Sequence, residues 1–259
     1  MLKVVDYVKA ILPEKYNQTL SNNSYLTFES TANEHTGEQT QRIAKYKNLK
    51  FEFKKSGVVY MTGSLHRFYN DGTHNYNDFT LENLCSSLRL IANNLSIELS
   101  EAVLQNIEFG VNIEPPIKVN ALLRGLLFHT GKKMPMEEFK HVSLQSGNYK
   151  QVRRDRFFLK AYDKGKHYNL KTNLFRWEVK IIKMVEIEHL NINNLNDLIN
   201  LSDNQLEGIL TMLKQRWNEV LYFDSSINKA LLKRRIKLKI NNWQSLIYSL
   251  APNKFGVIF

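Results

Sequence analysis

Short stretches of alternating apolar and polar residues run through the chain up to about residue 183 and predict strands with one buried face. The stretch LKFEFKKSGVVYMT, residues 49–62, alternates on both sides of KKSG and predicts a β-hairpin. Further strands are predicted at residues 25–30, 103–113, 156–163 and 174–183. The last three each combine an apolar face, which can pack on helices, with a face of charged or hydrogen-bonding groups.

Helical spacing predicts the remaining regular structure. Thr80 is the expected N-cap of a helix over residues 81–95, LENLCSSLRLIANNL. Residues 117–129 are apolar and predict a second helix. From residue 192 onward the apolar spacing is helical throughout. The predicted C-terminal helices cover residues 194–201, 203–223 and 226–250.

These elements predict an α+β fold, with an antiparallel sheet, helices packed on one of its faces and an open catalytic face on the other. A helical C-terminal part follows. We expect a first domain at residues 1–190 and a helical subdomain at residues 191–259. Two connections between elements are predicted to be irregular: GSLHRFYNDGTHNYNDF at residues 63–79 and the basic segment 130–150.

Positive charge is concentrated in the middle of the chain. Residues 116–183 hold 11 lysines and 5 arginines against 5 acidic residues, and this excess equals the net charge of +11 of the whole chain. Aromatic residues are interleaved with the basic ones, a combination that suits a phosphate backbone with stacked bases. A solvated basic face is the plainer interpretation. The basic residues expected to contact DNA are Arg153, Arg154, Arg156, Arg176, Lys166 and Lys180.

Several protein classes are excluded by the composition. No apolar run approaches the ~18 residues of a membrane helix, and the N-terminal stretch MLKVVDYVKAILPEKY lacks the small-residue cleavage site of a secretory signal. Cys85 is the only cysteine, so an internal disulfide framework and a cysteine-based zinc site are both excluded. We therefore expect a cytoplasmic protein that does not bind membranes.

Three predicted strands bring reactive groups to one face if they are neighbours in the sheet. This face would collect Glu108, Glu178, Tyr162, Lys160, Lys164, Arg176 and Asn112. Carboxylates bind Mg²⁺ or Mn²⁺ as hard oxygen ligands, and the bound ion polarises a phosphoryl oxygen. A tyrosine hydroxyl can then act as nucleophile while lysines hold the phosphate oxygens. Taken one by one, each acid is better explained as a solvated sheet position, and Tyr162 as an ordinary aromatic of a half-exposed sheet.

Three blocks of sequence together resemble the gene II/X proteins, the replication initiators of filamentous phages and related plasmids, which are rolling-circle nicking enzymes. The blocks are SLHRFYNDGTHNYNDFT at residues 64–80, QNIEFGVNI at residues 105–113, and FFLKAYDKGKHY with LFRWEVKI at residues 157–168 and 174–181. They occur in the order found in the family and span about half of the chain.

The resemblance implies roles for individual residues. Tyr162 matches the nicking tyrosine, and Lys164 matches the lysine two positions later, with Lys160 as a further catalytic candidate. Glu108 and Glu178 match acids of the second and third blocks and become metal-ligand candidates. His74 and Asn75 match the Gly-His-Asn element, and His74 is a third metal-ligand candidate. Thr73 stands where the family has glycine.

A second tyrosine is also a candidate nucleophile. In related Gram-positive plasmid initiators, the nicking tyrosine precedes a Tyr-Asp-Lys-Gly-like block by about a dozen residues, a position occupied here by Tyr149. We favour Tyr162, because the phage-type match extends over the other blocks.

The resemblance implies a site-specific DNA endonuclease and strand transferase that nicks and rejoins single-stranded DNA at a replication origin. The cofactor would be Mg²⁺ or Mn²⁺, the intermediate a 5′-phosphotyrosine, and the partners a host replication helicase and polymerase. We expect the segment 130–156 and the basic stretch ALLKRRIKLK, residues 230–239, to recognise the origin.

Two other functions remain compatible with the residues. One is a non-catalytic basic module that holds single-stranded nucleic acid, as a replication accessory or repressor. Carboxylates among the basic groups argue against this module, unless they pair with neighbouring lysine or arginine. The other is a metal nuclease that uses water and forms no covalent intermediate.

Overall fold

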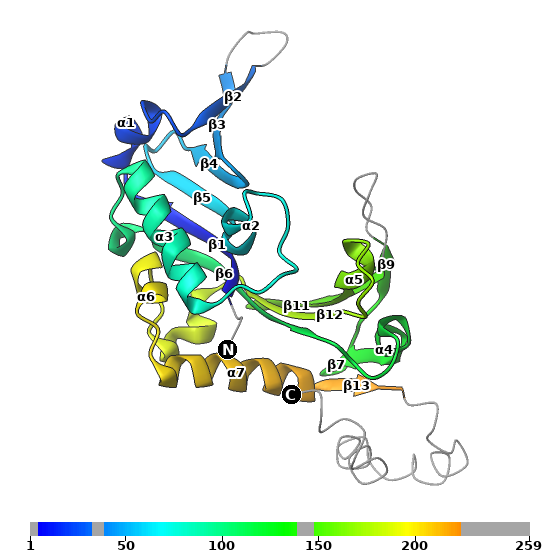
Figure 1. Cartoon of the computed structure of the whole chain (residues 1–259). Helices are drawn as coiled ribbons and strands as arrows, with labels where there is room; N and C mark the ends of the chain where they lie inside the picture. Colours follow the sequence, from blue (N-terminus) through cyan, green and yellow to red (C-terminus); the bar gives the residue numbers. More distant parts are fainter. Residues whose placement is uncertain (1–4, 33–38, 139–147, 224–259) are drawn as a thin grey trace, which may run out of the picture. The chain divides into compact units, whose positions relative to one another are not determined.

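The computed structural model describes residues 5–32, 39–138 and 148–223 (Figure 1). Within these residues one large sheet of ten strands has the order β2-β3-β4-β5-β1-β6-β12-β11-β10-β9, and a small sheet has the order β13-β7-β8. The large sheet is formed by β1 (Val5–Leu12), β2 (Thr27–Ala32), β3 (Gln39–Tyr46), β4 (Leu49–Phe53), β5 (Val59–Ser64), β6 (Val103–Ile113), β9 (Met136–Glu138), β10 (Asn148–Arg153), β11 (Phe157–Asp163) and β12 (Phe175–Ile181). The small sheet is formed by β7 (Leu126–His129), β8 (Lys132–Lys133) and β13 (Val220–Tyr222).

Helices connect and cover these strands. The α-helices are α1 (Tyr16–Ser21), α2 (Leu65–Tyr69), α3 (Leu81–Leu95), α4 (Val119–Gly125), α5 (Lys164–His167), α6 (Leu195–Ile199) and α7 (Asp203–Asn218). Two 3₁₀ helices are η1 (Leu99–Glu101) and η2 (Met184–Leu190). The α+β class with a large antiparallel sheet is confirmed.

The chain forms two compact units. The first comprises residues 1–111, 155–157 and 179–209, and the second comprises residues 112–154, 158–178 and 210–259. Their limits differ from the expected boundary at residue 190, which stays a prediction. Both β6 and β12 continue from one unit into the other without interruption, since the limits fall inside these strands.

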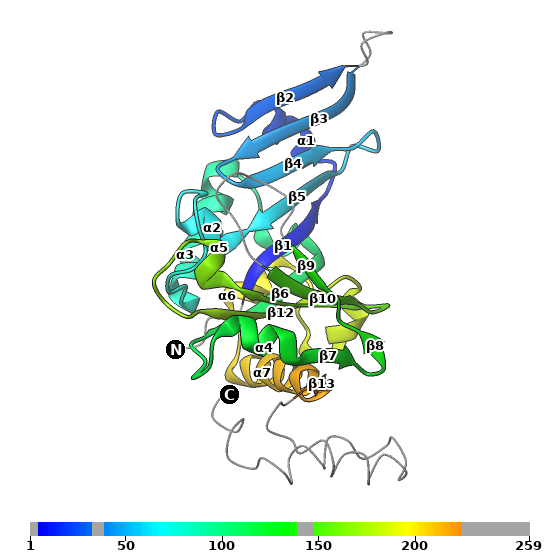
Figure 2. The same cartoon turned by 90° about the vertical axis from the view of Figure 1, so that its right-hand side faces the viewer.

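One face of the sheet in the first unit is covered by helices. Figure 2 views β2 to β5 from the opposite face, with α1 and α3 behind them. Burial alternates along β5, where Val59 and Met61 are fully buried and Tyr60 and Thr62 are only half-buried. This alternation is the signature of a sheet with one packed and one accessible face.

The second unit has its own core around two tryptophans. Trp177 of β12 packs edge-on against Trp217 of α7, with ring centroids 5.1 Å apart, and its indole Nε1 donates to the Leu213 carbonyl at 3.3 Å. Phe175 contacts the same Trp217 ring. The apolar face predicted for residues 174–183 is thus the face that packs on α7.

Most elements agree with the sequence-based predictions. The hairpin is confirmed as β4 and β5, and Thr80 caps α3 by accepting a hydrogen bond from the Asn83 amide at 3.2 Å. The strands predicted at 103–113, 156–163 and 174–183 are confirmed as β6, β11 and β12.

Four predictions were wrong in part. Residues 117–129 form α4 followed by β7, because β13 pairs with β7 and the Phe223 amide donates to the Gly125 carbonyl at 2.7 Å. The loop at 63–79 contains α2, whose N-cap is Ser64. Segment 130–150 contains β8, β9 and the start of β10. The helix predicted at 203–223 ends at Asn218.

The helix predicted at 226–250 and its basic stretch 230–239 lie outside the described residues. In the part of the chain that the structure covers, no helix is long and apolar enough to span a bilayer.

Candidate metal and phosphate site

Two carboxylates of the first unit face one another across β1 and β6. The register of β1 against β6 shifts between Val5 and Val8. The two residues within this shift, Asp6 and Tyr7, therefore stand opposite Glu108 alone, which is a β-bulge. An extra residue in a strand re-aims the side chains beside it, so the bulge brings Asp6 to the Glu108 side of the strand. Asp6 is 3% exposed and Glu108 is 7% exposed.

Asp6 is held in place from the segment that follows β5. Its Oδ2 accepts a hydrogen bond of 2.7 Å from the buried Asn75 amide, and its Oδ1 accepts one from the Ser64 hydroxyl. Ser64 is also the N-cap of α2, since its Oγ accepts from the Arg67 amide at 3.0 Å. Both oxygens of the carboxylate thus accept a hydrogen bond, and such partners are how ligating carboxylates are oriented in metal sites.

Glu178 of the second unit has hydrogen-bond partners within that unit. Glu178 of β12 accepts two hydrogen bonds on the same oxygen, from Tyr162 Oη at 2.9 Å and from Arg176 Nε at 2.8 Å. Arg176 also donates from Nη1 to Asn112 Oδ1 at 3.2 Å. Both side chains of the Glu178–Arg176 ion pair are only 4% exposed. Solvent therefore screens the attraction between the two charges only weakly.

Asp6, Glu108 and Glu178 form a buried group whose ligand oxygens all lie within 4.8 Å of one another. Glu178 ends the 158–178 segment of the second unit, and β12 continues directly from it into the first unit. Three carboxylates this close repel one another, and a divalent cation would relieve that repulsion. An all-oxygen donor set suits Mg²⁺ or Mn²⁺ rather than a softer metal. The residues therefore fit the expected cofactor.

The predicted lysines have different surroundings. Lys164 is fully buried as the first residue of α5, and Asp163 caps this helix by accepting from the Lys166 amide at 2.8 Å. Lys160 is half-buried on β11, on the same face as Tyr162. Asp163 therefore has a structural role as the N-cap of α5.

His74 precedes Asn75 and is not a member of the group of three carboxylates. Its ring stacks on Tyr76 with centroids 4.0 Å apart, and its carbonyl accepts from the Asn70 amide at 3.0 Å. The neighbouring His66 is buried, stacks on Phe79 and shares a 2.7 Å hydrogen bond with Asn77. These contacts stabilise the segment that carries Asn75, and a metal-ligand role for His74 stays a prediction.

The residues predicted to contact DNA fall into exposed and buried sets. Arg153, Arg156 and Lys166 are exposed, whereas Arg154 and Lys180 are half-buried. The Arg153 guanidinium lies 5.3 Å from the centre of the Phe158 ring, and Lys180 Nζ lies 4.0 Å from that of Tyr7. Arg176 is buried against Glu178, so the role that its contacts support is to position this carboxylate.

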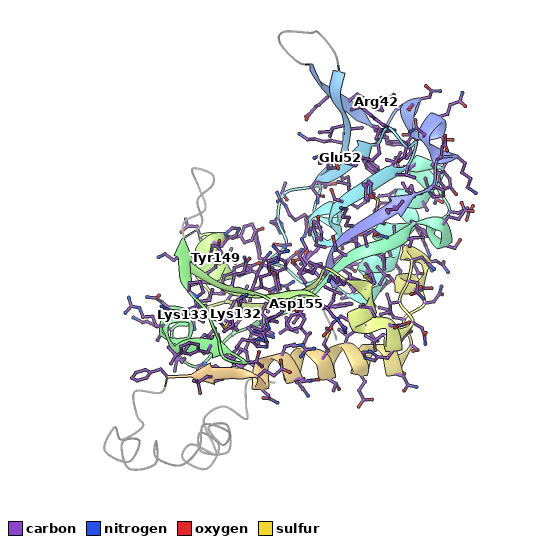
Figure 3. All side chains as sticks on the ribbon, turned by 180° about the vertical axis from the view of Figure 1, so that it is seen from behind. Arg42, Glu52, Lys132, Lys133, Tyr149 and Asp155 are labelled. Atoms are coloured by element: carbon purple, nitrogen blue, oxygen red, sulfur yellow. The ribbon has the colours of Figure 1, made fainter. Side chains whose placement is uncertain are left out.

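The alternative nucleophile lies beside the favoured one. Tyr149 of β10 pairs with Tyr162 of β11 in the antiparallel register. Figure 3 labels Tyr149, together with Lys132 and Lys133 of β8. Lys132 Nζ donates to the Arg153 carbonyl at 2.9 Å, which ties β8 to the end of β10.

Sequence reasoning missed Asp6. Residues 5–12, VDYVKAIL, alternate well enough to predict a strand, and burial confirms the alternation from Val8 onward. In a regular strand, however, Asp6 would lie on the same face as Val8, which is fully buried in the core. Only the bulge, which no sequence pattern indicates, turns the aspartate toward Glu108.

Comparisons with known proteins bear on the fold. No protein-family model matches the chain, and no curated protein matches its sequence. Among solved structures, the chain is similar to the rolling circle replication initiator protein from Geobacillus stearothermophilus, with a TM-score of 0.50 and 11% identity over 96% of each chain. Membership of the gene II/X family stays a prediction. The similarity extends over nearly the whole chain, which thus has the α+β fold of a rolling-circle replication initiator.

Proposed function

We propose that this chain initiates rolling-circle replication by nicking and rejoining single-stranded DNA at an origin, through a tyrosine–DNA intermediate. The observation that carries the proposal is the hydrogen bond from Tyr162 Oη to Glu178, a member of the buried group of three carboxylates. This contact supports the proposal, because it joins a potential nucleophile to carboxylates that could hold a divalent cation. The fold similarity to a replication initiator supports the same function.

The nicking step follows from these contacts. Tyr162 Oη attacks the phosphorus of one phosphodiester and forms a Tyr–O–P bond, while the bond from phosphorus to the 3′ oxygen breaks. Glu178 Oε1, which already accepts the phenol hydrogen bond, is the first acceptor for the departing proton. The leaving 3′ oxygen takes up a proton and becomes a free 3′-hydroxyl. Rejoining is the reverse reaction, so the phosphodiester energy is conserved in the tyrosyl ester.

The carboxylate group and its neighbours have separate tasks in this proposal. Asp6, Glu108 and Glu178 would hold Mg²⁺ or Mn²⁺, which supplies Lewis-acid polarisation of a phosphoryl oxygen. Arg176 orients Glu178 through their ion pair. Lys160, half-buried on the Tyr162 face of β11, is placed to bind a non-bridging oxygen of the phosphate.

The free 3′-hydroxyl implies the next partners. It is a primer for a DNA polymerase, and extension from it requires a helicase to separate the strands ahead. The host replication machinery would supply both. Assignment to the gene II/X family would follow if the origin is that of a phage or a related plasmid.

A covalent-adduct assay tests the function. The full chain is mixed with single-stranded DNA that spans its own replicon's origin, with and without Mn²⁺, and denaturing electrophoresis is followed by mass spectrometry of the linked residue. We expect a metal-dependent adduct on Tyr162. Cleavage without an adduct would instead establish a hydrolytic nuclease, and binding without cleavage would establish a non-catalytic module.

A further inference from the structure

The accessible face of the first unit carries a row of polar side chains that runs across five strands. The registers pair Lys45 with Lys50, Lys50 with Thr62, Thr62 with Lys9, and Lys9 with Asn106. Directly paired residues of antiparallel strands lie on the same face, so these five side chains form one line from β3 to β6. We call this line the lysine row.

Positive charge exceeds negative charge along this face. Lys54 joins the row from the end of β4, and its ammonium and that of Lys9 lie 5.4 Å and 4.6 Å from the centre of the Tyr60 ring. Two acidic side chains are ion-paired to the lysines of this face. Glu29 lies 2.7 Å from Lys45, and Glu52 lies 3.1 Å from Lys50 and 2.9 Å from Lys54. Four lysines thus face two glutamates, and Figure 3 shows Glu52 on this sheet.

The glutamates orient the lysines without cancelling them. Hydrogen bonds from Lys54 and then Lys50 hold the pKa of Glu52 below its usual value, so this side chain stays ionised and the lysines stay ordered around it. Lys45 and Lys50 keep about half of their side-chain surface, 51% and 43%, in contact with solvent. Their ammonium groups therefore remain accessible to an anion.

The row ends beside a carboxylate of the candidate site. Asn106 precedes Glu108 by two residues on β6, so both side chains lie on the same face of that strand. Four strand spacings of about 4.8 Å give the row a length of roughly 19 Å. This is long enough for several consecutive phosphates of an extended strand.

We infer that the lysine row binds the phosphate backbone of a single DNA strand and leads it to the carboxylate group. The inference rests on the proposed function, because it assigns the row to the strand that is nicked. A single file of ammonium groups matches one backbone, whereas a duplex presents two. Net charge along the chain does not indicate this surface, since all of the excess charge lies in residues 116–183.

Salt-dependent binding tests the inference without the nicking reaction. The probe is a fluorescein-labelled oligo(dT) of about 20 nucleotides, with fluorescence anisotropy recorded over a range of salt and in EDTA. Each lost phosphate contact lowers the magnitude of the slope of log K against log [salt] by about 0.7 for a single strand. We expect Lys9→Gln and Lys50→Gln each to lower it by about this amount, and Thr62→Lys to raise it by the same amount.

A matched control separates the row from a general charge effect. Lys15 is an exposed lysine that pairs with one glutamate, Glu101, as Lys50 pairs with Glu52, but it precedes α1 on the covered side of the sheet. Lys15→Gln should leave the slope unchanged. An equal decrease of the slope in Lys15→Gln and Lys50→Gln would overturn the inference. A decrease of the slope that is seen with a duplex probe and not with oligo(dT) would overturn it as well.

The two proposals fail in different ways. If the wild-type chain forms the tyrosine adduct but the lysine variants bind oligo(dT) with an unchanged slope, the row has no role and the function stands. If the lysine variants lower the slope and no adduct forms on origin DNA, the row stands as a strand-binding surface and the nicking function fails.

Discussion

Tyr149 lies directly opposite Tyr162 in the antiparallel pair of β10 and β11, so both candidate nucleophiles share one face of the sheet. Tyr162 donates to Glu178, which belongs to the carboxylate group, and this contact gives its phenol proton an acceptor. This contact is the reason for favouring Tyr162 as the nucleophile.

Replacing the two tyrosines one at a time should identify the nucleophile. We expect Tyr162→Phe to abolish the adduct and to slow nicking by about 10³-fold or more, since loss of a nucleophile removes the covalent route altogether. Tyr149→Phe should retain the adduct, with a rate within about tenfold of wild type. The measurement is a time course of nicking with Mn²⁺. An adduct that persists in Tyr162→Phe and maps to Tyr149 would move the chemistry to β10 and leave Tyr162 to orient Glu178.

Asn75 should control metal affinity through Asp6. Its amide donates to Asp6 Oδ2 at 2.7 Å, so Asn75→Ala frees the carboxylate to rotate. Loss of such a partner weakens metal binding by about 10- to 100-fold. Titration calorimetry with Mn²⁺ on the DNA-free protein measures this directly.

The control for Asn75→Ala is Asn23→Ala. The Asn23 amide donates to the Asn94 carbonyl at 2.8 Å, a bond of the same kind whose partners lie outside the carboxylate group. Asn23→Ala should leave Mn²⁺ affinity unchanged. Similar losses in both variants would show that Asn75 acts only through the general stability of the fold.

The effects of changing Arg176 and Glu178 on the unfolding free energy should not be additive. Both side chains are 4% exposed, so Arg176→Met leaves a carboxylate buried beside two others and should cost about 3–5 kcal/mol of unfolding free energy. Arg176→Met combined with Glu178→Met removes both charges and should cost less than the sum of the single changes. Urea unfolding in EDTA gives the three values. Additive losses would mean that the pair contributes nothing beyond its separate burial.

Much of the site was predictable because it lies on regular strands. Glu108, Glu178 and Tyr162 fall on the faces that alternation assigns to them, and period 2 applies locally without knowledge of strand order. The same rule failed at the start of β6, where Val103 is 47% exposed and Leu104 is buried. There the register against β1 shifts between Lys9 and Ala10, and a shift of this kind depends on the partner strand.

Other features depend on contacts between distant residues. β7 was predicted as helix because its apolar sequence suits either state, and only pairing with β13, about ninety residues later, selects a strand. Lys164 was expected on the same strand face as Tyr162, but it begins α5 and is fully buried, and its catalytic role stays a prediction. Long-range packing decided both outcomes, and no local pattern encodes it.

His129 should make the second unit less stable in mild acid. Its ring is 1% exposed, with Nε2 2.8 Å from Glu219 Oε2 and Nδ1 3.3 Å from the Thr130 hydroxyl. Burial lowers the His129 pKa below its usual value of about 6.5, and this effect outweighs the opposing one of Glu219. The folded protein therefore resists a proton that the unfolded chain accepts.

The sign of the pH effect follows from that difference. Above pH 6.5 neither state holds the proton and stability is at its full value, whereas below 6.5 the unfolded chain gains it first and stability falls. The neighbouring Glu219 does not interfere in this window. Burial alone would raise its pKa, but Arg216 and then His129 lower it below the usual value of 4.5, so it stays ionised.

Urea unfolding at pH 7.5 and pH 5.5 measures the contribution of His129. Wild type should lose up to about 1.4 kcal/mol per pH unit below 6.5 from this group. His129→Gln keeps a side chain that can donate to Glu219. This variant should lack the decrease in unfolding free energy that His129 causes below pH 6.5. His189→Gln, at an exposed histidine, is the matched control. Its unfolding free energy should decrease below pH 6.5 as in wild type. A pH dependence that is identical in wild type and His129→Gln would show that the buried ring takes up its proton equally well in both states.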